Sequence, residues 1–138
     1  MYKRQIQLIP QLCVRPGDEV VVADVTFGRY EEASKLMDGR IVRVPLADWR
    51  HDLEAIAAAV TGRTRLVWIC NPNNPTGTVV SRERAAAFLE AIPRHVAVVF
   101  HPASFAFVDD PDYGDGLDLP QPSFDNVIVL RPFPPPYP

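Results

Sequence analysis

Residues 65 to 77 read Arg-Leu-Val-Trp-Ile-Cys-Asn-Pro-Asn-Asn-Pro-Thr-Gly, and this stretch decides the fold. The apolar run from 66 to 70 is short and rich in strand-forming residues, which predicts a strand buried on both faces. The strand must end at Asn71, because the two prolines that follow have no N–H group to give to a sheet. Ser81 is the predicted N-cap of the next helix, ahead of its body at 85–92. The stretch therefore predicts a strand, a tight loop and a helix.

The rest of the chain repeats this alternation of short strands and helices. Strands of this kind, alternating with helices of about 10 to 12 residues, predict a mostly parallel α/β sheet with flanking helices. Such sheets bind ligands in the loops at the carboxyl ends of their strands. The further strands are predicted at 19–23, 40–45, 96–100 and 126–131, and the helices at 2–13, 29–37, 52–60 and 82–92.

Local signals add detail to these elements. In the first helix, Pro10 is expected to kink or end the helix, and the apolar positions have near-helical spacing. Asp52 is predicted to cap the third helix, and His51 in front of it is interpreted as a solvated residue rather than a ligand. Cys70 is expected to be a small buried thiol at the end of its strand. The apolar positions of the first helix are Ile6, Leu8, Ile9 and Leu12.

Composition narrows the classes of partner and compartment. A chain of 138 residues is long enough for one domain. Its net charge is -3, from 14 basic and 17 acidic residues, and it has no dense basic run. The sequence therefore does not predict a basic surface that would bind nucleic acid or an anionic membrane. No apolar run approaches the length of about 18 residues needed to span a bilayer. Two cysteines are too few for a disulfide framework, so we expect a cytoplasmic protein with neither nucleic acid nor membrane as partner.

The loop string resembles the Asn-Pro-Asn-Asn-Pro-Thr-Gly signature of fold-type I pyridoxal-phosphate aminotransferases of class I and II. Together with Val-Arg-Pro-Gly-Asp-Glu-Val at 14–20 and Thr-Phe-Gly-Arg-Tyr at 26–30, it makes the chain similar to histidinol-phosphate aminotransferases over roughly residues 5–131. The resemblance implies pyridoxal 5'-phosphate as cofactor and amino transfer between an amino acid and a 2-oxo acid or phosphorylated ketone. It also implies a transferase of histidine biosynthesis and a homodimer.

The resemblance has a consequence for domain organisation. Members of the family are more than twice as long as this chain, with a large cofactor-binding domain and a small domain. The chain is therefore expected to be a fragment of the large domain over residues 1–131, followed by a Pro-rich tail at 132–138.

Three site residues follow from the matching motifs. By resemblance, Asn74 would hydrogen-bond the cofactor's 3′-oxygen, Phe27 would stack on the pyridine ring, and Tyr30 would reach the substrate site of a neighbouring subunit. The residues alone allow a simpler interpretation, in which Phe27 and Tyr30 plug the edge of the sheet against the helix at 29–37. Val25 replaces a proline that is usual in the family, which is expected to loosen the loop.

The residues that carry the chemistry of the family are replaced. His101 stands where an aspartate would pair with the ring nitrogen of the cofactor, and a histidine supplies no negative charge to stabilise a pyridinium. Ser104 stands in place of a tyrosine, and Pro135 takes the place of the lysine that would form the Schiff base. The only lysines, Lys3 and Lys35, are not suitable substitutes. The sequence therefore predicts an inactive chain without covalent cofactor, and no metal site.

A second hypothesis is a non-catalytic α/β scaffold, natural or engineered, that presents the rewritten rim at 101–107 and 132–138 to a protein partner. Local sequence corruption in a real aminotransferase would leave the same pattern, and the sequence does not separate these explanations. Residues 134–137 also match the short Pro-Pro-x-Tyr ligand of WW domains, a motif that arises often by chance. The residues that would form an exposed apolar interface, or cover one another, are Phe105, Phe107, Phe133 and Tyr137.

Overall fold

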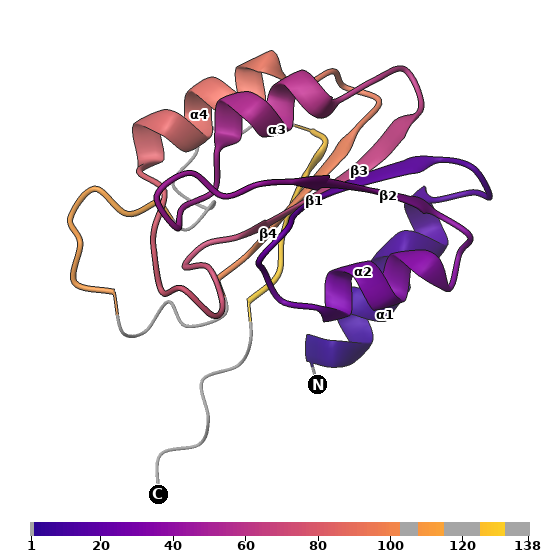
Figure 1. Ribbon diagram of the computed structural model, residues 1–138, viewed down its shortest axis with the longest axis horizontal. Helices are drawn as coiled ribbons and strands as arrows, with labels where there is room; N and C mark the ends of the chain where they lie inside the picture. The colour runs from indigo at the N-terminus through magenta and orange to yellow at the C-terminus, as the bar shows by residue number, and fades with distance from the viewer. Residues whose placement is uncertain (1, 103–107, 115–124, 132–138) are drawn as a thin grey trace, which may run out of the picture.

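The computed structural model describes residues 2–102, 108–114 and 125–131 (Figure 1). Within these residues, no helix is long and apolar enough to cross a membrane. Each predicted strand and helix is present, with bounds that differ from the prediction by a few residues at most. The elements are α1 Tyr2–Cys13, β1 Glu19–Ala23, α2 Arg29–Lys35, β2 Arg40–Val44, α3 Leu53–Ala59, β3 Thr64–Cys70, α4 Arg82–Ala91, β4 Ala97–His101 and β5 Val127–Val129.

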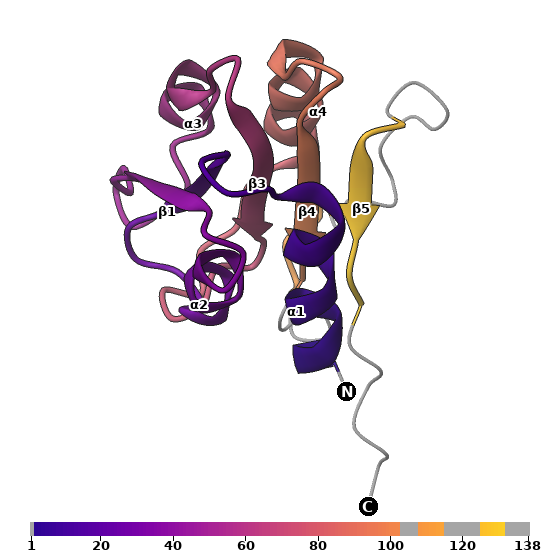
Figure 2. The ribbon, with the colours of Figure 1, turned by 90° about the vertical axis from the view of Figure 1, so that its right-hand side faces the viewer.

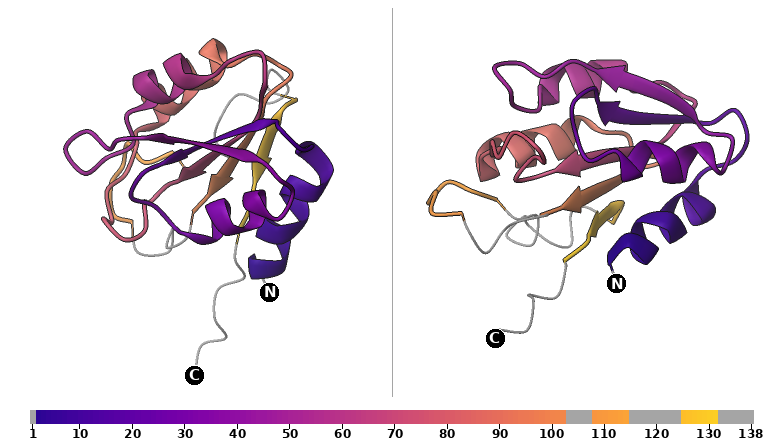
Figure 3. Two further views of the ribbon diagram at one scale, coloured as in Figure 1. Left: turned by 45° about the vertical axis from the view of Figure 1, so that its right-hand side comes forward. Right: turned by 60° about the horizontal axis from the view of Figure 1, so that its bottom comes forward.

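The strands form one parallel sheet in the order β2-β1-β3-β4-β5. Helices α3 and α4 cover one face, and α1 and α2 lie side by side on the other (Figures 2 and 3). The chain leaves β1 toward one edge through α2 and leaves β3 toward the other edge through α4. Loops diverge at such a point, so a crevice for ligands is expected beyond the carboxyl ends of β1 and β3. The predicted α/β sheet with flanking helices is confirmed.

Strand β3 is the centre of two hydrophobic cores. Trp68 and Cys70 pack on the α1 and α2 side, whereas Val67 and Ile69 pack on the α3 and α4 side. All four side chains are fully buried. Because removing a Val or Ile side chain from water is worth about 1.5–3 kcal/mol, both faces of β3 stabilise the fold. The prediction of a strand buried on both faces is confirmed.

Helix α1 has the predicted bounds, and Pro10 lies inside it without ending it. The core contacts come from Ile6 and Ile9, which are buried, whereas Leu8 is 47% exposed and Leu12 is 77% exposed. Residues two positions apart in a helix are separated by about 200° around its axis, so Leu8 cannot share the face of Ile6. The near-helical spacing of the four apolar positions therefore did not show which of them are buried.

Candidate functional site

The carboxyl ends of β1, β3 and β4 bring the predicted site loops together. The Thr26 hydroxyl donates to Oδ1 of Asn73 over 2.8 Å, which joins the loop after β1 to the loop after β3. The backbone N–H of Asn71 donates to the carbonyl of His101 over 3.3 Å, which joins the same loop to the end of β4. Segments that are more than 25 residues apart in the sequence thus form one edge.

An aromatic cluster lies beneath this edge. The ring of Tyr30 stacks on Trp68 with centroids 4.6 Å apart and planes 9° apart. Phe27 meets Tyr30 edge-on at 5.5 Å and lies 6.1 Å from the ring of His101. Tyr30 and Trp68 are fully buried, whereas Phe27 is partly exposed. Phe27 and Tyr30 therefore pack between α2 and the sheet, and the substrate role that the resemblance gives to Tyr30 stays a prediction.

His101 is buried and uncharged at neutral pH. Its side chain is 1% exposed, and its Nδ1 lies 2.7 Å from the hydroxyl of Tyr30. Burial lowers the pKa of His101 to about 4, since a charged imidazole loses its hydration inside the protein. The end of β4 therefore presents a neutral ring rather than a negative charge.

The asparagines of the loop after β3 divide between surface and interior. Asn74 is exposed, whereas Asn71 and Asn73 are each 2% exposed. The Asn71 amide accepts from the N–H of Val80 over 2.8 Å and donates to the carbonyls of Val80 and Gly114 over 3.1 and 3.0 Å. The side chain of Asn71 thus satisfies backbone groups of Val80 and Gly114, as the backbone of a neighbouring strand would do, and holds the two ends of the loop together. No role was predicted for Asn71 or Asn73, although a tight turn alone does not require three asparagines.

The segment 108–114 lies against the same loop. The Tyr113 hydroxyl donates to the carbonyl of Asn71 over 2.8 Å, and the N–H of Arg82 donates to the carbonyl of Asp112 over 2.8 Å. Burial raises the pKa of Tyr113 to about 12, so the phenol keeps its proton at neutral pH. The start of α4 is therefore covered by this segment.

His51 corrects the prediction of a solvated residue. It is 2% exposed, and its Nε2 lies 3.0 Å from the carbonyl of Cys70. Because a carbonyl can only accept, Nε2 carries the hydrogen. Burial lowers the pKa of His51 to about 4. The residue is buried because the segment before α3 folds over the end of β3; the neighbouring prediction, Asp52 as N-cap, is confirmed by its bond from the N–H of Ala55 over 2.9 Å.

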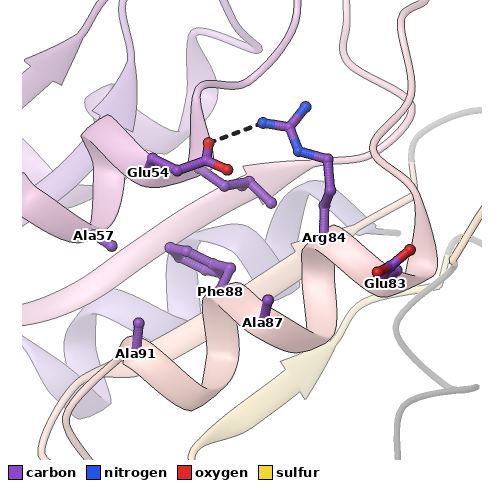
Figure 4. A pocket seen from close by; sticks show the side chains of 8 residues that line it. Glu54, Ala57, Glu83, Arg84, Ala87, Phe88 and Ala91 are labelled. Atoms are coloured by element: carbon purple, nitrogen blue, oxygen red, sulfur yellow. Dashed lines mark hydrogen bonds and ion pairs between the residues drawn. The ribbon is translucent and has the colours of Figure 1, made fainter.

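A separate hollow of about 350 Å³ lies between α3 and α4 (Figure 4). Its walls include Leu53, Ala57 and Phe88, and an ion pair between Glu54 and Arg84 spans the two helices at 2.8 Å. None of the described cofactor or substrate candidates, which are Phe27, Tyr30, Asn74 and His101, lines it. Some predicted residues lie outside the described part of the chain, namely Ser104, Phe105, Phe107, Phe133, Pro135 and Tyr137.

The edge fits only part of a pyridoxal-phosphate site. Phe27 and Asn74 lie at its surface, where they can offer a ring face and an amide to a ligand. The neutral His101 does not fit a protonated ring nitrogen. In the described part of the chain, the lysines lie on helices α1 and α2 rather than at this edge, and Lys35 is paired with Glu31. Among the described residues, this edge therefore presents an aromatic ring and an amide, but neither an anionic side chain at the position of His101 nor a lysine amine.

The aminotransferase class I and II family model matches residues 2–106. Histidinol-phosphate aminotransferase of Moorella thermoacetica is 45% identical over 128 residues, covering 93% of this chain and 33% of that protein. The enzyme of the same name from Caldicellulosiruptor saccharolyticus is 41% identical over 127 residues, covering 92% of this chain and 35% of that protein. The chain thus spans about a third of the length of the curated relatives it matches.

Solved aminotransferase structures match the chain as well. The chain resembles histidinol-phosphate aminotransferase from Sinorhizobium meliloti in complex with pyridoxal-5'-phosphate, with a TM-score of 0.79 and 32% identity over 91% of this chain and 34% of that chain. It also resembles N-succinyldiaminopimelate aminotransferase from Mycobacterium tuberculosis, with a TM-score of 0.77 and 27% identity over 93% of this chain and 35% of that chain. With the sheet order, the loops and the family match in agreement, the chain belongs to the aminotransferase class I and II family.

Proposed function

We propose that the chain is part of the cofactor-binding domain of a histidinol-phosphate aminotransferase-like protein and that it does not catalyse amino transfer as this chain. The family match and the relatives named histidinol-phosphate aminotransferase support the first half of the proposal. Histidine biosynthesis is part of the same proposal, because the name of those relatives implies it. The homodimer, which the sequence resemblance implies, and the cytoplasmic location, which the two cysteines led us to expect, are proposed with it.

The neutral side chain of His101 is the main support for the proposal that this chain does not catalyse amino transfer. When bound, pyridoxal phosphate acts as an electron sink most effectively with a protonated ring nitrogen, which a neighbouring negative charge maintains. His101 is uncharged at neutral pH because its pKa is about 4, and the Tyr30 hydroxyl at 2.7 Å holds the ring in place. No step of transamination is therefore assigned to this edge.

The replacement of the catalytic lysine supports the same conclusion. Catalysis in this class depends on a lysine that condenses with the cofactor and moves a proton. Pro135 at the matching position has no amine. Lys35, on α2, forms an ion pair with Glu31. We propose that any contact with pyridoxal phosphate is non-covalent and comes from Phe27 and Asn74.

The test is an intact-mass measurement after incubation with pyridoxal phosphate and borohydride reduction, beside an untreated sample. We expect no stoichiometric adduct, and no transamination of histidinol phosphate by the same preparation. A Lys35→Arg variant separates a specific adduct from scattered labelling. A one-to-one adduct that this variant abolishes would overturn the proposal, because it would reveal a relocated Schiff base.

The alternative function is a protein-binding scaffold, natural or engineered, that uses the rim at 101–107 and 132–138. Its support is the neutral histidine at position 101, where the family has an aspartate. The rest of the rim, apart from residue 102, lies outside the described residues. Titration with a WW domain tests the motif at 134–137, and a Tyr137→Ala variant is the matched control. Saturable binding that this variant loses would favour the scaffold.

A further inference from the structure

The side chain of Asn73 is buried between two loops and uses both ends of its amide. Its Oδ1 accepts from the hydroxyl of Thr26 over 2.8 Å, and its Nδ2 donates to the carbonyl of Val25 over 3.0 Å. A carbonyl oxygen only accepts, so the nitrogen must face Val25 and the orientation of the amide is settled by its partners. One amide thus holds two consecutive residues of the loop that carries Phe27.

The same amide continues into a chain of hydroxyl groups. Its Nδ2 also donates to Oγ1 of Thr76 over 2.9 Å, and the hydroxyls of Thr76 and Thr78 lie 2.9 Å apart. The Thr78 hydroxyl donates to the carbonyl of Trp49 over 2.6 Å, so its single hydrogen is used there and Thr76 must donate to Thr78. Every hydrogen from Thr26 to Trp49 therefore points in one direction, an arrangement in which neighbouring hydrogen bonds strengthen one another.

This chain of hydrogen bonds joins three loops at the carboxyl edge. Thr26 follows β1, Asn73 follows β3, and Trp49 lies in the turn between β2 and α3. Trp49 has a φ of 63°, in the left-handed region that costs a non-glycine residue free energy. The hydrogen bond that its carbonyl accepts from Thr78 helps to hold this conformation.

We propose that Asn73 is a positioning residue that fixes where Phe27 and Asn74 stand relative to each other, which rests on the proposed function of this edge. Phe27 follows Thr26 directly, and Asn74 follows Asn73 directly. Replacing the amide by a carboxylate removes both N–H donors and places an anionic oxygen against the carbonyl of Val25. The loop after β1 is then no longer held against the loop after β3.

An NMR comparison tests this without any ligand. The variants are Asn73→Asp and, as matched control, Asn126→Asp, which changes an amide that donates to the carbonyl of Val96 over 2.7 Å, near the start of β4. We expect the nuclear Overhauser contacts between the rings of Phe27 and His101, whose centroids lie 6.1 Å apart, to be lost in Asn73→Asp and kept in Asn126→Asp. If Asn73→Asp does not fold, Thr26→Val removes one donor only and decides the question. Unchanged ring contacts in the folded variant would overturn the proposal.

A binding measurement separates the positioning role from a merely structural one. Pyridoxamine phosphate has no aldehyde, so it probes non-covalent recognition without reacting with lysines. We expect Asn73→Asp to bind it about tenfold more weakly than Asn126→Asp, as for the loss of about one hydrogen bond. Equal binding by the two variants would overturn the positioning role and leave the proposed function intact. No binding by the unchanged chain would count against the proposed function, and the ring contacts would still decide the role of Asn73.

Discussion

The hydroxyl of Tyr30 lies 2.7 Å from Nδ1 of His101, and both residues are buried. This pair joins α2 to the end of β4 across the sheet. Replacement of Tyr30 by Phe removes the hydroxyl and keeps the stack on Trp68, so the change isolates the polar contact. We expect a loss of about 1–3 kcal/mol in the free energy of unfolding, as for a buried polar group that loses a partner. Urea denaturation measures it, and a loss below about 0.5 kcal/mol would contradict the expectation.

Acid should destabilise the fold through two buried histidines. The folded pKa values of His51 and His101 are about 4, below the ordinary value of 6.5. The unfolded chain therefore binds more protons between these values, and stability is lost as the pH falls from about 6.5 toward about 4. Each unit of pKa depression corresponds to about 1.4 kcal/mol.

The measurement for this prediction is the urea midpoint from pH 7 to pH 4. His95 is exposed, so a His95→Gln variant is the matched control and should keep the pH dependence of the unchanged chain. A His51→Gln variant should flatten the curve. A midpoint that does not move over this range would contradict the assignment of His51 and His101 as buried neutral side chains.

Asn71 should matter more for stability than the cap of the helix that follows it. Asn71→Asp removes donors to the carbonyls of Val80 and Gly114, both inside the protein. Ser81→Ala removes only the acceptor for the N–H of Arg84 at 3.3 Å. We expect about 1 kcal/mol for the cap and at least twice that for Asn71. Thermal unfolding of the two variants side by side measures the difference, and an equal loss would contradict it.

The two tryptophans give a further matched pair. Trp68 is fully buried and stacks on Tyr30, whereas Trp49 is 70% exposed. Trp68→Leu should cost roughly 2–4 kcal/mol because it leaves a cavity and removes the aromatic stack. Trp49→Leu should change the free energy of unfolding by less than about 0.5 kcal/mol. Chemical denaturation compares them, and similar values would show that the core contact is weaker than its burial indicates.

The sequence predicted those features that depend on neighbours along the chain. The strand from Thr64 to Cys70 follows from its apolar run, and the caps at Asp52 and Ser81 follow from residue type and position. The loop after β3 follows from its two prolines. These signals act over a few residues, so one sequence contains all the information they need.

Contacts between distant segments were beyond such reasoning. His51 is buried because the segment before α3 folds over the end of β3, where its Nε2 donates to the carbonyl of Cys70, 19 residues later. Asn73 reaches Thr26, 47 residues earlier. In α1, the spacing showed that apolar residues recur but not which of them are buried, and Leu8 and Leu12 are exposed. The missed residues are those whose surroundings are set by the topology.

The sheet order places β3 between β1, from the first part of the chain, and β4, from the last part. In the chain, β1 is separated from β3 by α2, β2 and α3, and β4 is separated from β3 by the crossover helix α4. Pairings between such distant segments form slowly, because a long loop must close first. We therefore expect the edge that carries Phe27, Asn73 and His101 to assemble late in folding. A chain cut between β2 and α3 would divide this edge between two pieces, and only their reassociation could restore it.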